Sequence, residues 1–156
     1  MRGDTVSTVR LRNLPEAIRS LGALANPDYV DLYTVTTSEA TDKSPEDWAR
    51  IALEETPTGR SAPSLWRLLG LRLGPRHSPD YVQGWKIANR GDNSIRLETA
   101  SRFMTAHAVV HVDEAHVSVA LFLRYDWPIA ALVWRPVSII HRRAVPAMLR
   151  QAFKAQ

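Results

Sequence analysis

The sequence predicts an α+β domain in which an antiparallel sheet is covered by a long C-terminal helix. Three observations support this prediction. Apolar residues recur mainly at helical spacing in the first half of the chain, at the alternating spacing of strands in the second half, and again at helical spacing over residues 127–156. Because a sheet with one apolar face must be covered, the final helix is the natural cover.

The first half contains helix signals around one strand. Ser44 followed by Pro45, with Asp47 three residues after the serine, is the clearest helix start in the chain. Asn13 is expected to cap an earlier helix. The segment 56–63 is expected to break the chain, because it contains two prolines and a glycine. The expected elements are helices over 13–24, 43–55 and 64–74 and a strand over 29–37.

The second half is predicted to form an antiparallel meander. Turn-forming residues lie at 91–93 and 113–115, and such short connections join antiparallel neighbours, since parallel strands need crossovers of a dozen or more residues. In the third of the strand-like runs, the even positions from Met104 to Val112 are apolar and are expected to pack on helices. The four expected strands cover 81–90, 93–102, 102–112 and 116–126.

The C-terminal segment is predicted to be one amphipathic helix. Asp126 is expected to cap it and Pro128 to lie in its first turn. Pro136 and Pro146 each remove an N–H donor at a cost of about 3 kcal/mol, so we expect kinks. The kinks either let the helix follow a curved sheet or open space beneath it. The expected buried stripe consists of Ile129, Leu132, Val133, Val137, Ile140, Ala144 and Met148.

Composition excludes several classes of function. The 156 residues suit a single domain over 1–156, in which a flexible segment over 1–14 is left as an option. The absence of cysteine excludes thiolate nucleophiles and disulfides, and it favours a cytoplasmic location. The net charge of +4 comes without a nucleic-acid-binding motif, so no nucleic-acid partner is predicted. No run of about 20 apolar residues is present, so no transmembrane segment is expected.

Three side chains are candidates for catalysis. His141 lies beside the apolar stripe and can exchange protons near neutral pH, or it can hydrogen-bond a carbonyl freed by a helix proline. Glu98 can act as a general base if it is buried, or it can pair with Arg96. Arg124 can clamp a ligand oxygen with its fork of donors, or it can pair with Glu98 or Asp126.

Four further side chains are candidates for the wall of a ligand cavity. Trp85 and Trp134 suit an aromatic wall, although core packing alone would also explain them. Phe103 and His107 share one face of the strand over 102–112, and that face is either exposed to solvent or lines a pocket. His107 and His111 lie about 13 Å apart along a strand, too far to share an ion, so neither a metal nor a cofactor is predicted.

The order of several motifs resembles a bacterial family of helix-grip domains related to the START and polyketide-cyclase superfamily. The chain carries "DYVDLYTV", "SPEDWARIAL" and "GWKIANRGDNSIRLET", and then "LFLRYD". It departs from the family where residues 125–128 stand in place of His-Asn-x-x-Gly, and where the Arg-Pro pair is shifted to 135–136. Residues that match the C-terminal motif are Trp134, His141, Arg142, Val145, Pro146 and Leu149.

The resemblance implies a curved antiparallel sheet that grips the C-terminal helix, with a cavity between them. It implies that the cavity binds a hydrophobic or aromatic small molecule, as cavities of the wider superfamily hold sterols, lipids, polyketides and hormones. The alternative is an enzyme, a cyclase, dehydratase or isomerase that uses His141 or Glu98 as acid or base. A third possibility is a protein or membrane-surface partner bound by the basic side of the last helix. A homodimer is left as an option.

Overall fold

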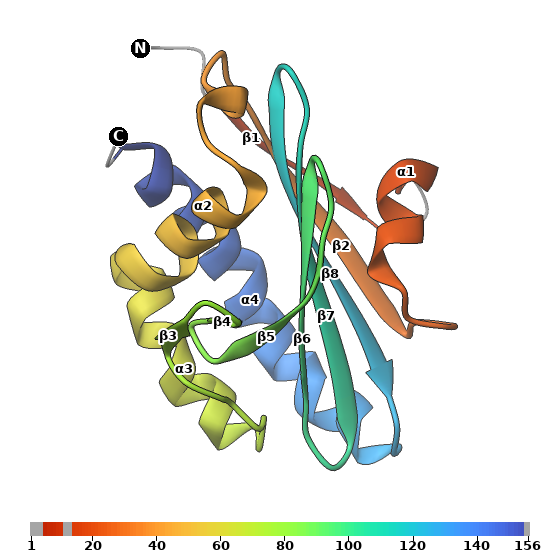
Figure 1. The fold of residues 1–156 in the computed structure, drawn as a ribbon. Coiled ribbons are helices and arrows are strands. Elements are labelled where there is room, and N and C mark those ends of the chain that lie inside the picture. Colours follow the sequence, from red (N-terminus) through yellow and green to blue (C-terminus); the bar gives the residue numbers. More distant parts are fainter. Residues whose placement is uncertain (1–4, 11–13, 155–156) are drawn as a thin grey trace.

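The computed structural model describes residues 5–10 and 14–154 and has an α+β, helix-grip-like fold (Figure 1). An eight-stranded antiparallel sheet has the strand order β1-β2-β8-β7-β6-β5-β4-β3. The strands are β1 (Thr5–Arg10), β2 (Tyr29–Thr36), β3 (His77–Ser78), β4 (Tyr81–Val82), β5 (Trp85–Arg90), β6 (Ser94–Ala100), β7 (Met104–Val112) and β8 (His116–Tyr125). The helices are α1 (Glu16–Arg19), η2 (Ser20–Gly22), η3 (Ala40–Asp42), α2 (Pro45–Arg50), the π-helix η4 (Ile51–Glu55), α3 (Pro57–Leu68) and α4 (Ile129–Lys154).

The predicted meander is confirmed. Strands β5 to β8 pair in sequence order, and β8 then pairs with β2, so that the early strand lies beside the last one. The sequence did not predict β1, which pairs with β2 and extends the sheet beyond it, within the segment 1–14 for which flexibility was an option. The expected cap Asn13 lies outside the described residues.

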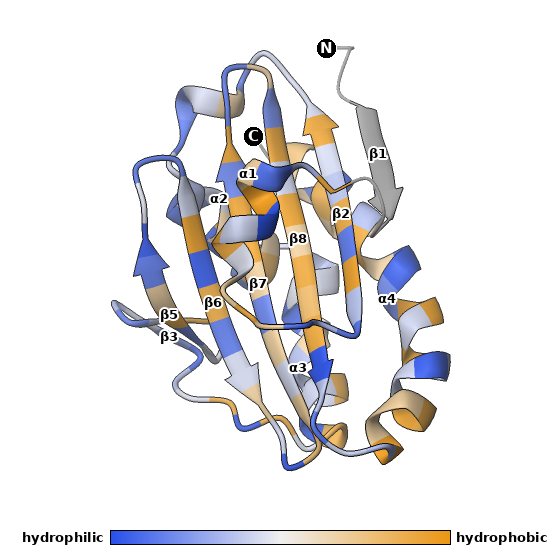
Figure 2. Ribbon diagram, turned by 90° about the vertical axis from the view of Figure 1, so that its right-hand side faces the viewer, coloured by the Kyte–Doolittle hydropathy of each residue, from blue (hydrophilic) through white to orange (hydrophobic). Residues whose placement is uncertain are grey.

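The two faces of the sheet are covered by different elements. Helices α2, α3 and α4 lie on one face, here called the inner face, while α1 and η2 lie on the outer face (Figures 1 and 2). The alternation of β7 divides between them as predicted: Met104, Ala106 and Val110 belong to the inner core. The odd face was expected to be exposed to solvent or to line a pocket, and neither expectation holds at Val109, which belongs to a small buried outer core with Ile18 of α1.

Helix α2 begins as predicted, but the boundary of α3 was predicted wrongly. Ser44 caps α2, and its Oγ accepts the N–H of Asp47 at 3.0 Å. The segment expected to break the chain instead opens α3, because Pro57 occupies its first turn and the Thr56 hydroxyl accepts the N–H of Gly59. A threonine cap followed by proline is typical of a helix start, so Pro57 marks the first turn of a helix and not a break.

Helix α4 is a single helix that contains both Pro136 and Pro146. Its buried face differs from the predicted stripe: Ile129, Leu132 and Ile140 are about half or more exposed. The predicted stripe is displaced around the helix, because it followed the most apolar residues, whereas the sheet meets a neighbouring face that includes a serine. The buried residues are Ala130, Trp134, Ser138, Val145, Met148, Leu149 and Ala152.

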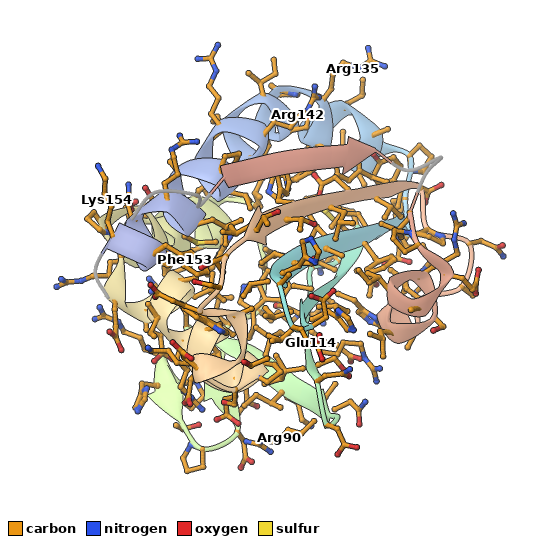
Figure 3. All side chains as sticks on the ribbon, turned by 90° about the horizontal axis from the view of Figure 1, so that it is seen from above. Arg90, Glu114, Arg135, Arg142, Phe153 and Lys154 are labelled. Carbon is orange, nitrogen blue, oxygen red and sulfur yellow. The ribbon has the colours of Figure 1, made fainter. Side chains whose placement is uncertain are left out.

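The expected cap of α4 was also wrong. The carboxylate of Asp126 accepts hydrogen bonds from Arg124 and Thr105 and not from the first turn of the helix, which begins after Pro128. Arg135 and Lys154 project from α4 away from the sheet (Figure 3). Within the described residues, no helix combines the length and hydropathy that crossing a bilayer requires.

Candidate functional site

A cavity of about 300 Å³ lies between the inner face of the sheet and helices α3 and α4. Its wall is almost entirely apolar, and His141 is its one imidazole. The lining residues include Leu65 and Trp66 of α3, Trp85 of β5, Ala106, Ala108 and Val110 of β7, Val119, Leu121 and Leu123 of β8, and Trp134, Val137, Ile140, His141, Ala144 and Met148 of α4.

Small side chains account for the space. Ala106 and Ala108 lie on the inner face of β7, and their neighbours on the adjacent strand β8 are Leu123 and Leu121. Ala144 faces the cavity from α4. Protein interiors normally fill to the density of an organic crystal, so alanines gathered on two facing elements leave a void that larger residues would close. The cavity therefore exists because these three positions are alanine and not a larger residue.

A buried carboxylate and an imidazole meet at the cavity wall. The side chain of Asp31, on β2, is only 1% exposed, and its Oδ2 lies 2.9 Å from Nε2 of His141 on α4. His141 is 17% exposed and lines the cavity. A buried charge is costly without partners, so this contact between β2 and α4 requires α4 to be packed correctly against the sheet.

Two phenols also donate hydrogen bonds to Asp31. The hydroxyls of Tyr29 and Tyr33 donate to the same Oδ2 atom at 2.6 and 3.3 Å. Burial, and then the negative charge of Asp31, raise the pKa of Tyr29, so the phenol stays protonated and remains a donor. Positions 29, 31 and 33 share one face of β2, since side chains alternate along a strand. One strand thus supplies the carboxylate and both phenols.

Aromatic rings surround the imidazole. The centroid of the His141 ring lies 5.4 Å from Trp134, 5.9 Å from Tyr33 and 6.4 Å from Tyr29. Trp134 also packs edge-on against Tyr29 at 5.1 Å. These contacts hold the ring in place, so the direction of its two nitrogens is set by the fold.

Three polar atoms near this wall have no hydrogen-bond partner among the described residues. Two are the indole Nε1 atoms of Trp85 and Trp134, which line the cavity, and the third is Oδ1 of Asp31, the partner of His141; Nε of Arg142, the next residue on α4, is also buried without a partner among the same residues. Buried polar groups are normally paired, and leaving one unpaired costs about 1–3 kcal/mol. Unpaired groups gathered at one cavity are typical of a site built for purposes other than stability.

The structure brings three of the predicted site residues together and separates the others. Trp85, Trp134 and His141 all line the cavity. Phe103 packs against the inner core, and its carbonyl accepts the N–H of Asp126, but it is not a lining residue.

Glu98, His107 and Arg124 lie on the outer face, away from the cavity. Glu98 pairs with Arg96 at 2.9 Å and approaches Nε2 of His107 at 3.6 Å. His107 is buried under η2, and its Nδ1 lies 2.6 Å from the carbonyl oxygen of Gly22. Arg124 pairs with Asp126 at 2.8 Å. The ion pairs weighed as alternatives for Glu98 and Arg124 are thus present.

Sequence reasoning missed Asp31, Tyr29 and Tyr33 as site residues. A signal was available, because "YVDLYTV" places one charged residue among apolar ones on a strand, and a buried charge requires partners. The partner itself was not predictable, since His141 lies 110 residues further along the chain.

Comparison with known proteins adds no assignment. No family model, no curated protein and no solved structure matches this chain. Among the described residues, no group of three or more histidines and carboxylates is placed to hold a metal ion. Function is therefore best judged from the cavity and from the Asp31–His141 pair.

Proposed function

We propose that this protein binds a hydrophobic small molecule, aromatic or aliphatic, in the cavity between the sheet and α4. The observation that carries the proposal is an apolar cavity of about 300 Å³ whose wall includes His141, an imidazole held by the buried carboxylate of Asp31 behind it. Concave apolar sites with a few convergent polar groups are the usual form of ligand sites. The START-like and polyketide-cyclase-like resemblance of the motifs agrees with such a role and forms part of the proposal.

Filling the cavity tests the proposal. Leucine at position 108 or 106 extends a larger side chain from β7 into the space that a ligand would occupy, because both alanines line the cavity. We expect Ala108→Leu and Ala106→Leu to weaken binding of the neutral fluorescent probe N-phenyl-1-naphthylamine at least tenfold. Fluorescence titration measures the dissociation constant, and circular dichroism checks the fold.

The matched control is Ala88→Leu, which makes the same change on β5 at an exposed position outside the cavity. Its affinity for the probe is expected to equal that of the wild type. Equal affinities for all three variants and the wild type, with the fold intact, would show that the probe binds elsewhere and would refute the cavity as the binding site.

A second candidate function is proton transfer within the bound molecule. The Asp31–His141 contact favours it, because a carboxylate that orients an imidazole is the arrangement of a general base. In such a step, Nδ1 of His141 takes a proton from a carbon next to a carbonyl group and returns it to another carbon of the same molecule. This isomerisation conserves all atoms and needs no co-reactant.

Exchange of carbon-bound hydrogen tests the second candidate. In D2O, the protein is expected to accelerate deuterium incorporation into 2-tetralone at least tenfold over the same concentration of free imidazole, measured by proton NMR. The acceleration should disappear in Asp31→Asn and persist in Glu98→Gln, since Glu98 lies on the outer face. A rate equal to that with imidazole alone would exclude this function for an enolisable ketone.

A further inference from the structure

The hydrogen on Nε2 of His141 can be placed from the hydrogen bonds around Asp31. Oδ2 receives the hydroxyls of Tyr29 and Tyr33, so its lone pairs act as acceptors, while Oδ1 has no described acceptor to which a carboxylic proton could be donated. Asp31 is therefore the accepting partner, and Nε2 of His141, at 2.9 Å, carries the hydrogen. In a neutral imidazole, the other nitrogen then holds a lone pair.

That other nitrogen, Nδ1, remains available to a ligand. Across residues 5–10 and 14–154, no hydrogen bond to Nδ1 of His141 is formed. The neighbouring Arg142 is directed to Ser138, whose Oγ accepts from Nη2 at 2.8 Å. The ring lines the cavity and packs against the rings of Tyr33 and Trp134.

We propose that the cavity selects an apolar, ring-sized molecule that carries one hydroxyl or N–H donor, and that this donor bonds to Nδ1 of His141. The inference rests on the proposed ligand-binding function and adds the chemical class of the ligand. The rest of the molecule meets an apolar wall, so the single donor distinguishes it from plain hydrocarbons and from ethers. Asp31 acts as a positioning residue, because it sets which nitrogen of the imidazole accepts.

Three probes of similar size test the proposal on the unmodified protein: 1-naphthol, 1-methoxynaphthalene and naphthalene. Naphthol offers a donor, the methoxy compound has the oxygen without the hydrogen, and naphthalene has neither. One hydrogen bond in a desolvated site predicts that naphthol binds about tenfold more tightly than 1-methoxynaphthalene. Isothermal titration calorimetry measures all three dissociation constants.

The outcomes separate the inference from the proposed function. If the three probes bind with equal affinity, or the methoxy compound binds best, the cavity binds apolar molecules but the donor rule is wrong. If none of them binds, the proposed function fails, and the inference fails with it.

Asp31→Asn tests the role of the carboxylate. An amide at position 31 can donate to Nε2 of His141, which moves the ring hydrogen to Nδ1 and removes the acceptor. The tenfold ratio between naphthol and 1-methoxynaphthalene is expected to fall to about one. Because the ratio compares two probes on one protein, it cancels a general loss of binding. Asp126→Asn, the same change on the outer face, should keep the ratio, and an unchanged ratio in Asp31→Asn would overturn the role of Asp31.

Discussion

A charged residue in the middle of an apolar strand is explained by the donors that surround it. Asp31 is almost fully buried, and the hydroxyls of two tyrosines and the imidazole of His141 all reach one of its oxygens. Desolvating a carboxylate is unfavourable unless hydrogen bonds replace its water. The three donors come from β2 itself and from α4, so the residue depends on the tertiary fold for its partners.

Ionisation of Tyr29 is expected to lower the stability of the folded protein at alkaline pH. Its pKa is raised in the folded protein, mainly by burial and then by Asp31, whereas an unfolded tyrosine ionises near pH 10. The folded state therefore holds a proton that the unfolded state loses, and stability that is fully present below about pH 10 is lost as the pH rises above it. We expect the free energy of unfolding to fall more steeply above pH 10 in the wild type than in Tyr29→Phe.

Urea unfolding at pH 8, 9, 10 and 11 measures this difference. Tyr125, whose pKa is also raised by burial, is present in both proteins and so cancels in the comparison. Parallel stability profiles for the wild type and Tyr29→Phe would contradict the burial of the Tyr29 phenol beside Asp31.

At the scale of elements, one arginine joins the helical layer to the edge of the sheet. Arg50, at the end of α2, pairs with Glu46 and Glu54, one turn away on either side. Its guanidinium also donates to the carbonyl oxygens of Ser78 and Tyr81, on the short strands β3 and β4. Its side chain is only 15% exposed, and it joins α2 to both short strands at once.

Replacing Arg50 tests how much its contacts with β3 and β4 stabilise the fold. Arg50→Ala is expected to lower the free energy of unfolding by about 2–4 kcal/mol, because charge-assisted bonds to partly buried partners are lost. Arg50→Lys should recover less than half of the loss, since an ammonium group cannot reproduce the planar fork of donors. Urea unfolding measures both variants, with the more exposed Arg90→Lys as the control. Full recovery by lysine would show that only the charge matters.

On the outer face, a histidine side chain likewise joins two elements by a hydrogen bond. His107 on β7 bonds the carbonyl oxygen of Gly22, which fastens η2 across the sheet. A side chain at position 22 would not fit, because a Cβ there would lie 2.7 Å from the ring of Phe122. His107 therefore has a packing role that its position on a mixed polar and apolar strand face did not reveal.

The whole molecule is a sheet with one face filled and the other left partly hollow. On the outer face, Ile18 and Phe122 belong to a small closed core. On the inner face, the larger core surrounds the cavity. An empty apolar cavity costs stability, because the atoms that line it lose contacts.

The same alanine variants that test ligand binding test this cost. Without ligand, Ala108→Leu is expected to raise the free energy of unfolding by about 0.5–2 kcal/mol, the usual gain from filling a cavity. Ala88→Leu should leave it nearly unchanged. A gain in stability together with a loss of probe binding would show that the cavity lowers stability but is needed for binding. A large loss of stability in Ala108→Leu would mean that the space is too small for the added group.

Local patterns determined much of this protein. The alternation of β6 to β8, the turns between them and the serine cap of α2 depend on residues close together in the chain, so they could be predicted from the sequence. Trp85, Trp134 and His141 could be named as candidates for the same reason: aromatic and titratable residues stand out on apolar elements.

Only the tertiary structure decided which face of each element is used. Helix α4 buries Ser138 and exposes Leu132, because the inner face of the sheet selects the side that fits it and not the most apolar side. Glu98 and His141 were both candidates in the sequence, yet the strand face of one and the helix face of the other place them on opposite sides of the sheet. The pairing of Asp31 with His141 joins residues 110 positions apart, a distance at which local spacing carries no information. Sequence thus set the elements and their candidate chemistry, while long-range packing chose which groups meet.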